Sequence, residues 1–175
     1  MRSRPFPSRH RGMTLVELLI TLAISAVLAV AAWPSLSDMI AQQRVTQAAD
    51  RLAASLALAR TTAAMRRTEV RLSPYGDADS LDQGWQLTAV RGGLEGSEPP
   101  LSVVSLNDLC LSITLRGTAG PQSLHLTAVG YSRSERGGFF AATFEVRCRE
   151  ARRQVRLGAQ GRIRTCQPGV DVDCD

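Results

Sequence analysis

The chain opens with a short polar, basic stretch, which one long apolar run follows. Residues 13–33 are almost entirely apolar, and Glu17 is the one charged residue among them. As a helix, these 21 residues extend about 31 Å at about 1.5 Å per residue, which is enough to cross the hydrocarbon core of a bilayer. The pattern therefore predicts a membrane-spanning helix over residues 13–33.

The apolar pattern continues beyond residue 33 with helical spacing. Between residues 35 and 67 the apolar positions recur mostly three or four residues apart, while glutamines, arginines and Asp50 fall largely on the remaining faces. The apolar positions are Leu36, Met39, Ile40, Ala48, Leu52, Leu56, Ala59 and Ala63. The spacing predicts one continuous helix from residue 13 to about residue 67, with its second half packed on a globular head.

After residue 67 the period changes from helical to alternating. Short alternating runs are separated by Gly- and Pro-containing turns, which is typical of β-strands. The expected strands are residues 69–73, 84–91, 109–116, 123–129, 139–149, 152–157 and 162–166, with a loop over 92–100. One long helix followed by many short strands predicts an α+β fold in which an antiparallel sheet packs on the helix.

The composition argues against an enzyme. All 21 basic residues are arginines, which excludes Schiff-base lysines and P-loop lysines. The chain has two histidines, so a Ser-His-Asp triad or a multi-histidine metal site has almost nothing to use. The one candidate base, His125, alternates with Leu124 and Leu126 and is expected at a strand surface. No cofactor is expected.

Charge is unevenly distributed along the chain. The first twelve residues hold four arginines and no acid, and residues 133–164 hold nine arginines against three acids. The last eleven residues carry three aspartates and no base. Arginines before the apolar run keep the N-terminus cytoplasmic and send the remainder of the chain outward.

Glu17 needs a partner within the apolar segment, since a carboxylate there costs about 2–3 kcal/mol by insertion scales. Cleavage between Gly12 and Met13 would provide one. The new α-amine of Met13 would lie four residues before Glu17 on the same helical face, where it could neutralise the carboxylate.

Residues 12–18, Gly-Met-Thr-Leu-Val-Glu-Leu, resemble a class III prepilin signal. The resemblance implies that prepilin peptidase cleaves after Gly12 and methylates the new N-terminus at Met13, and that Glu17 guides filament assembly. The family usually has Phe where Met13 stands. The alternative is an ordinary secretory signal peptide cleaved after an A-x-A site at residues 29–31, but its apolar region would be shorter and uncharged.

A second resemblance covers most of residues 12–166. The segment 57–72, with Gly84-Trp85 after it, resembles the minor pilins and pseudopilins of the GspH/FimT family. It implies a pilin-like fold, an inner-membrane protein with a periplasmic head that later enters a filament, and other pilins as partners. The expected parts are a leader (1–12), a transmembrane or filament-core helix (13–33), the periplasmic half of the helix (34–68) and a β-rich head with an acidic tail (69–175).

All four cysteines follow the membrane segment, in agreement with an oxidising periplasm. Cys110, Cys148, Cys166 and Cys174 allow three pairings, and the sequence does not choose among them. A Cys166–Cys174 bridge would close a small C-terminal loop, in which case Cys110 and Cys148 would join two strands. No spacing is CxxC, so no zinc site is predicted.

The C-terminal arginines alternate with apolar residues. On strands, this pattern places up to six guanidinium groups on one sheet face, which suits the phosphates of a nucleic-acid backbone and reads no bases. Val155, Leu157 and Ile163 are expected to point inward and Arg153 to lie at a turn. The outward positions are Arg147, Arg149, Arg152, Gln154, Arg156, Arg162 and Arg164.

Gly161-Arg162-Ile163-Arg164 resembles the GRxR motif of FimT-like minor pilins, which bind DNA during uptake for natural transformation. The resemblance implies that Arg162 and Arg164 bind duplex DNA independently of sequence, with Arg152, Arg153 and Arg156 in support.

These arginines have alternative interpretations that do not involve DNA. They could solubilise a strand edge, or pair with Glu145, Glu150 or the acidic tail. The protein would then be a structural minor pilin or a minor pseudopilin of type II secretion.

Overall fold

The computed structural model describes residues 14–76, 78–90, 99–116, 123–134 and 138–174. The leader, the cleavage site between Gly12 and Met13 and most of the expected loop over residues 92–100 lie outside the described residues. The chain divides into two compact units, Met1–Ser37 and Asp38–Asp175. Helix α1 (Leu15–Arg66) begins in the first unit and ends in the second.

In the first unit, α1 exposes apolar side chains along its whole length, from Leu15 to Trp33. By length and composition this helix could cross a membrane. Its first turn is capped by Thr14, whose Oγ1 accepts a hydrogen bond from the main-chain N–H of Glu17 at 3.3 Å. The predicted long helix is confirmed, and it runs through Pro34 without a break.

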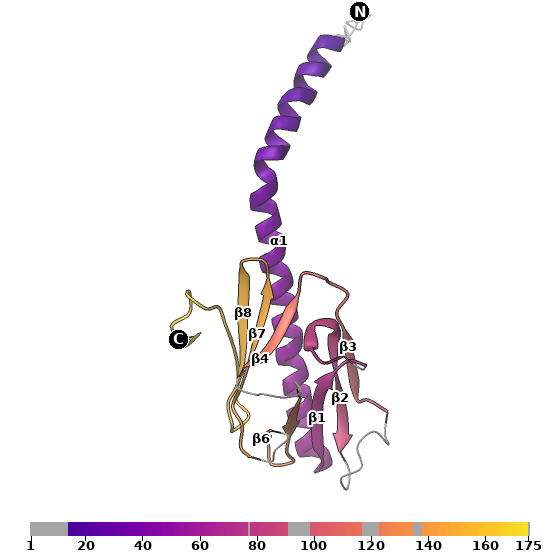
Figure 1. The fold of residues 1–175 in the computed structure, drawn as a ribbon, viewed down its shortest axis with the longest axis vertical. Helices are drawn as coiled ribbons and strands as arrows, with labels where there is room; N and C mark the ends of the chain where they lie inside the picture. The colour runs from indigo at the N-terminus through magenta and orange to yellow at the C-terminus, as the bar shows by residue number, and fades with distance from the viewer. Residues whose placement is uncertain (1–13, 77, 91–98, 117–122, 135–137, 175) are drawn as a thin grey trace, which may run out of the picture. The chain divides into compact units, whose positions relative to one another are not determined.

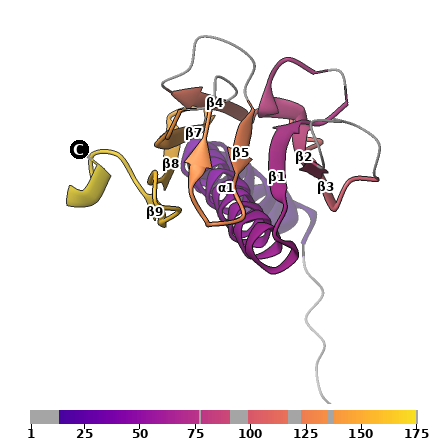
Figure 2. The same ribbon diagram turned by 90° about the horizontal axis from the view of Figure 1, so that it is seen from below.

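In the second unit, one face of α1 is buried. The buried positions include four of those with the predicted helical spacing, Leu52, Leu56, Ala59 and Ala63, each with no exposed surface. Two antiparallel sheets lie around one side of this part of the helix (Figure 2). Trp85 from one sheet is fully buried, and its Nε1 donates to Ser55 Oγ on the helix at 2.9 Å.

The first sheet has five strands in the order β3-β2-β1-β5-β6. Its strands are β1 (Glu69–Pro74), β2 (Gly84–Val90), β3 (Ser102–Ser105), β5 (Leu124–Leu126) and β6 (Ser132–Arg133). Strands β1, β2 and β3 lie side by side in Figure 1. A short 3₁₀ helix (Leu81–Gln83) precedes β2. The inward residues Val70, Leu72, Leu87, Leu124 and Leu126 join the core.

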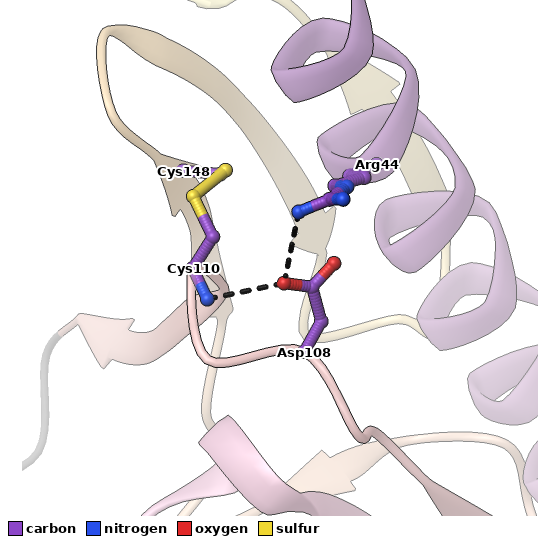
Figure 3. Close-up of a disulfide and its surroundings, with 4 residues drawn as sticks. All are labelled: Arg44, Asp108, Cys110 and Cys148. Carbon is purple, nitrogen blue, oxygen red and sulfur yellow. Dashed lines mark hydrogen bonds and ion pairs between the residues drawn. A yellow bond between two sulfur atoms is a disulfide. The ribbon is translucent and has the colours of Figure 1, made fainter. Parts of the chain in front are cut away.

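The second sheet has four strands in the order β4-β7-β8-β9. Its strands are β4 (Ser112–Arg116), β7 (Ala142–Cys148), β8 (Ala151–Leu157) and β9 (Ile163–Cys166). A disulfide joins Cys110, in the turn before β4, to Cys148 at the end of β7 (Figure 3). Beside it, Asp108 Oδ1 accepts hydrogen bonds from Arg44 Nη1 at 3.2 Å and from the N–H of Cys110 at 3.1 Å.

Several sequence expectations need correction. The strands form two sheets rather than one, and the short strands β3 and β6 were not predicted. The expected strand over residues 109–116 begins only at Ser112, because the preceding residues form the turn that holds Cys110. His125 takes the outward position between the buried Leu124 and Leu126, as expected, but its side chain is only 12% exposed and its Nδ1 lies 3.1 Å from Glu69 Oε1.

Candidate nucleic-acid interface

The two faces of the four-stranded sheet differ sharply in chemistry. Phe144, Val146, Val155 and Leu157 point toward the helix and are buried. Arginines occupy many of the opposite, outward positions, as the alternation predicted. We call this surface the arginine face; its arginines are Arg116, Arg147, Arg152, Arg156 and Arg164.

Strand register brings arginines directly opposite one another on the arginine face. Arg147 of β7 lies opposite Arg152 of β8, and Arg156 of β8 lies opposite Arg164 of β9. The register therefore gathers four guanidinium-bearing side chains on one surface of the sheet, within reach of a single extended anion.

The arginine face contains one buried carboxylate. Glu145 is 3% exposed. It forms ion pairs with Arg116 of β4 and with Arg147, whose Nη2 lies 2.7 Å from Glu145 Oε1. Burial alone would raise the pKa of Glu145, but the hydrogen bonds and charges of Arg147 and Arg116 outweigh it and hold the pKa below its ordinary value. The predicted alternative, in which arginines pair with Glu145, is thus realised for Arg147 and also for Arg116, whose role the sequence analysis missed.

Arg153 does not lie at a turn, as the sequence predicted. The turn between β7 and β8 consists of Arg149 and Glu150, and Arg149 adopts a left-handed conformation with φ 55°. Arg153 belongs to β8, opposite Val146, and is therefore on the inner side of the sheet. Its half-buried side chain leaves Nε without a hydrogen-bond partner.

The GRxR segment begins in the hairpin between β8 and β9. Gly161 is buried with φ +78°, and a Cβ at this position would lie 2.3 Å from the carbonyl oxygen of Gly130. The Gly161 carbonyl accepts a hydrogen bond from Arg60 Nη1 at 3.0 Å. Glycine is therefore required here for close backbone packing, a structural reason separate from any contact with a ligand.

Arg162 and Arg164 are both exposed, on either side of the half-buried Ile163. Within the described part of the chain, the side chain of Arg162 forms no hydrogen bond or ion pair. The hairpin thus places Arg162 next to the arginine face with its guanidinium open to solvent.

The C-terminal tail is tied to the outward side of the sheet. The Cys166–Cys174 disulfide is present, so the structure selects one of the three possible cysteine pairings. Arg156 Nη2 donates to the carbonyl oxygen of Cys174 at 2.7 Å, and Asp171 Oδ2 accepts from the N–H of Gln167 at 2.6 Å. The tail therefore contacts Arg156 through its main chain.

The described residues contain no group of three or more His, Cys, Asp or Glu side chains placed to hold a metal ion. The chemistry that the arginine face offers is binding of phosphate oxygens, since guanidinium groups present paired donors that match them.

The long helix, the antiparallel sheets and the apolar N-terminal segment together define a type IV pilin-like protein. Residues 7–33 match the prokaryotic N-terminal methylation motif. Residues 48–161 match the family described as Type II transport protein GspH. The chain belongs to this family, and it is a minor pilin or pseudopilin.

Solved structures show the same fold. The type IV minor pilin FimU of Pseudomonas aeruginosa matches with a TM-score of 0.57 and 20% identity, over 70% of this chain and 88% of FimU. The minor pseudopilin EpsH from the Type 2 Secretion System of Vibrio cholerae matches with a TM-score of 0.51 and 14% identity, over 71% of this chain and 98% of EpsH. No curated protein matches the sequence significantly.

Proposed function

We propose that this minor pilin binds duplex DNA through the arginine face and Arg162, and that it serves DNA uptake in natural transformation. The observation that carries the proposal is the strand register, which places Arg147 opposite Arg152 and Arg156 opposite Arg164 on one face of the sheet. A row of guanidinium groups on one surface matches the row of phosphates along a nucleic-acid backbone.

The binding mode follows from the chemistry of the side chains. Guanidinium groups on one sheet face contact phosphate oxygens and leave base edges unread, so binding is independent of sequence and needs no cofactor. Each neutralised phosphate releases counterions, so affinity falls steeply as salt rises. Arg152, Arg162 and Arg164 are exposed, and Arg153 would contribute least because it lies on the inner side.

The N-terminal segment would anchor the head, first in the inner membrane and then in the filament. Prepilin peptidase would cleave after Gly12 and methylate Met13, and the α-amine of Met13 would neutralise Glu17 within the inner membrane or the filament. The head would lie in the periplasm and then on the filament, among other pilins.

The test is a salt series of duplex-DNA binding by the full chain in non-ionic detergent, compared with the Arg162→Gln/Arg164→Gln variant. Loss of two phosphate contacts should weaken binding and reduce the log–log salt slope by about 2. Arg51→Gln/Arg66→Gln is the matched control, since it removes two exposed arginines of α1 and the same net charge. Equal binding by all three proteins would refute the proposal.

A structural role without DNA binding is the second candidate. The match to the GspH family and the likeness to EpsH favour it. In that case the arginines would contact neighbouring subunits, and neither the wild type nor the variants would bind DNA at physiological salt.

A further inference from the structure

Two aromatic side chains are exposed beside the GRxR hairpin. Phe139 is 75% exposed and Tyr131 is 40% exposed. Their rings are in edge-to-face contact, with centroids 5.3 Å apart and planes at 73°. Val129, 80% exposed, lies two residues before Tyr131. Clustered exposed apolar groups of this kind mark interaction sites more often than single ones do.

The main chain holds this pair in position. Phe139 forms a β-bridge with Arg133, and the carbonyl of Tyr131 accepts a hydrogen bond from the N–H of Thr127 at 2.9 Å. The N–H of Phe140 donates to the carbonyl of Ser132 at 3.0 Å. The two rings are therefore presented on paired backbone, which lowers the entropy lost when a flat ligand stacks on them.

The pair adjoins the GRxR hairpin through direct backbone contact. The N–H of Ser132 donates to the carbonyl of Ala159 at 3.1 Å. A Cβ on Gly161 would lie 2.3 Å from the carbonyl oxygen of Gly130, so these two glycines pack closely. Tyr131 follows Gly130 and Arg162 follows Gly161, which places a ring and an open guanidinium on touching segments.

The charge around the rings favours an anionic partner. The sequence of residues 127–140 and 158–164 holds four arginines, Arg133, Arg136, Arg162 and Arg164, against one acid, Glu135. Arg60 reaches the same place from the helix, where it bonds to the Gly161 carbonyl. An aromatic pair among arginines suits a nucleobase with its phosphate better than it suits an uncharged apolar protein surface.

We propose that Tyr131 and Phe139 form a stacking platform for unpaired bases of a DNA strand whose phosphates lie on Arg162 and the arginine face. The inference rests on the proposed function and adds a ligand class to it, single-stranded DNA. Stacking is tolerant of base identity because every base has a π-face, so the platform adds affinity without sequence preference.

The experiment separates stacking from phosphate binding. The full chain in non-ionic detergent is titrated with a single-stranded thymidine oligonucleotide and with an abasic oligonucleotide of the same length, which retains the phosphates and lacks the bases. The wild type should prefer the thymidine strand by about ten-fold. Tyr131→Ala/Phe139→Ala should abolish this preference while abasic-strand and duplex affinities stay unchanged, and Tyr131→Phe should retain it.

Each outcome of these titrations supports or overturns base stacking on Tyr131 and Phe139. Equal affinity of the wild type for both single strands, or a preference that survives the double substitution, overturns the platform while DNA binding itself stands. No binding of any DNA overturns the proposed function as well.

Discussion

Glu145 supplies the arginine face with its own counter-charge. It is buried between Arg116 and Arg147, so those two guanidinium groups are partly neutralised before any ligand arrives. Arg152 and Arg162, by contrast, face solvent. The arginines of one face are therefore not equivalent as binding groups.

Replacing Glu145 should change stability in a pH-dependent way. Its pKa is lowered in the folded chain, so its stabilisation is fully present above the ordinary value of 4.5 and disappears as pH falls through the lowered pKa. Glu145→Gln should cost about 2 kcal/mol at pH 7 and converge with the wild type in acid. Denaturant unfolding followed by circular dichroism at several pH values measures this difference.

Glu150→Gln is the matched control for that substitution, because Glu150 is exposed in the turn after β7 and carries the same charge. A loss of stability as large in this variant as in Glu145→Gln would contradict the role assigned to the buried ion pairs.

At the residue scale, the sequence predicted the outward arginines because strand alternation depends only on local spacing. It misplaced Arg153 because the turn position depends on Arg149, whose left-handed backbone ends β7 one residue earlier than expected. It could not show the packing of Gly130 on Gly161, or the exposure of Tyr131 and Phe139. The glycine contact joins segments about thirty residues apart, and the exposure of the two rings depends on how the surrounding strands pair, neither of which a local period encodes.

At the scale of elements, the C-terminal tail, residues 167–174, is fixed to the outward side of the four-stranded sheet; we call this segment the strap. The Cys166–Cys174 bridge and the hydrogen bond from Arg156 to the Cys174 carbonyl hold it there. A tail held in this way occupies one arginine that would otherwise be available to a phosphate.

Releasing the strap should therefore strengthen DNA binding. Cys166→Ser/Cys174→Ser should lose about 2–3 kcal/mol of stability, as a short closed loop predicts, and should gain about two- to three-fold in duplex affinity because the Cys174 carbonyl no longer holds Arg156. Cys110→Ser/Cys148→Ser is the control, since it removes a bridge near Arg44 with no contact to the tail. Weaker DNA binding after release of the strap would count against this account.

The local pattern of apolar and polar residues predicts the helix and the longer strands but misses the two shortest strands and the division into two sheets. Helix α1 was predictable because a continuous apolar run over residues 13–33 leads directly into apolar positions at helical spacing over residues 35–67. β3 and β6, with four and two residues, are too short to show alternation. The division into two sheets follows from pairing across long loops, which the period of a single strand cannot reveal.

At the scale of the whole molecule, positive charge is concentrated in the part of the sequence that forms the four-stranded sheet. The chain has a formal net charge of +5, and nine of its 21 arginines lie in residues 133–164, the region that includes β7, β8 and the start of β9. β-Strands can present many arginines on one surface, because alternation directs the arginine side chains to one face of the sheet and the core side chains to the other. The first unit contributes the exposed apolar helix suited to a membrane or a filament.

The central claim is that DNA lies on the arginine face, and chemical protection of arginines tests it most directly. The full chain in detergent would be treated with a guanidinium-specific reagent with and without duplex DNA, and modification mapped by mass spectrometry. The account predicts slower modification of Arg152, Arg162 and Arg164 in the presence of DNA and unchanged modification of Arg51 and Arg66. Unchanged rates at Arg152, Arg162 and Arg164, under conditions where DNA is bound, would contradict it.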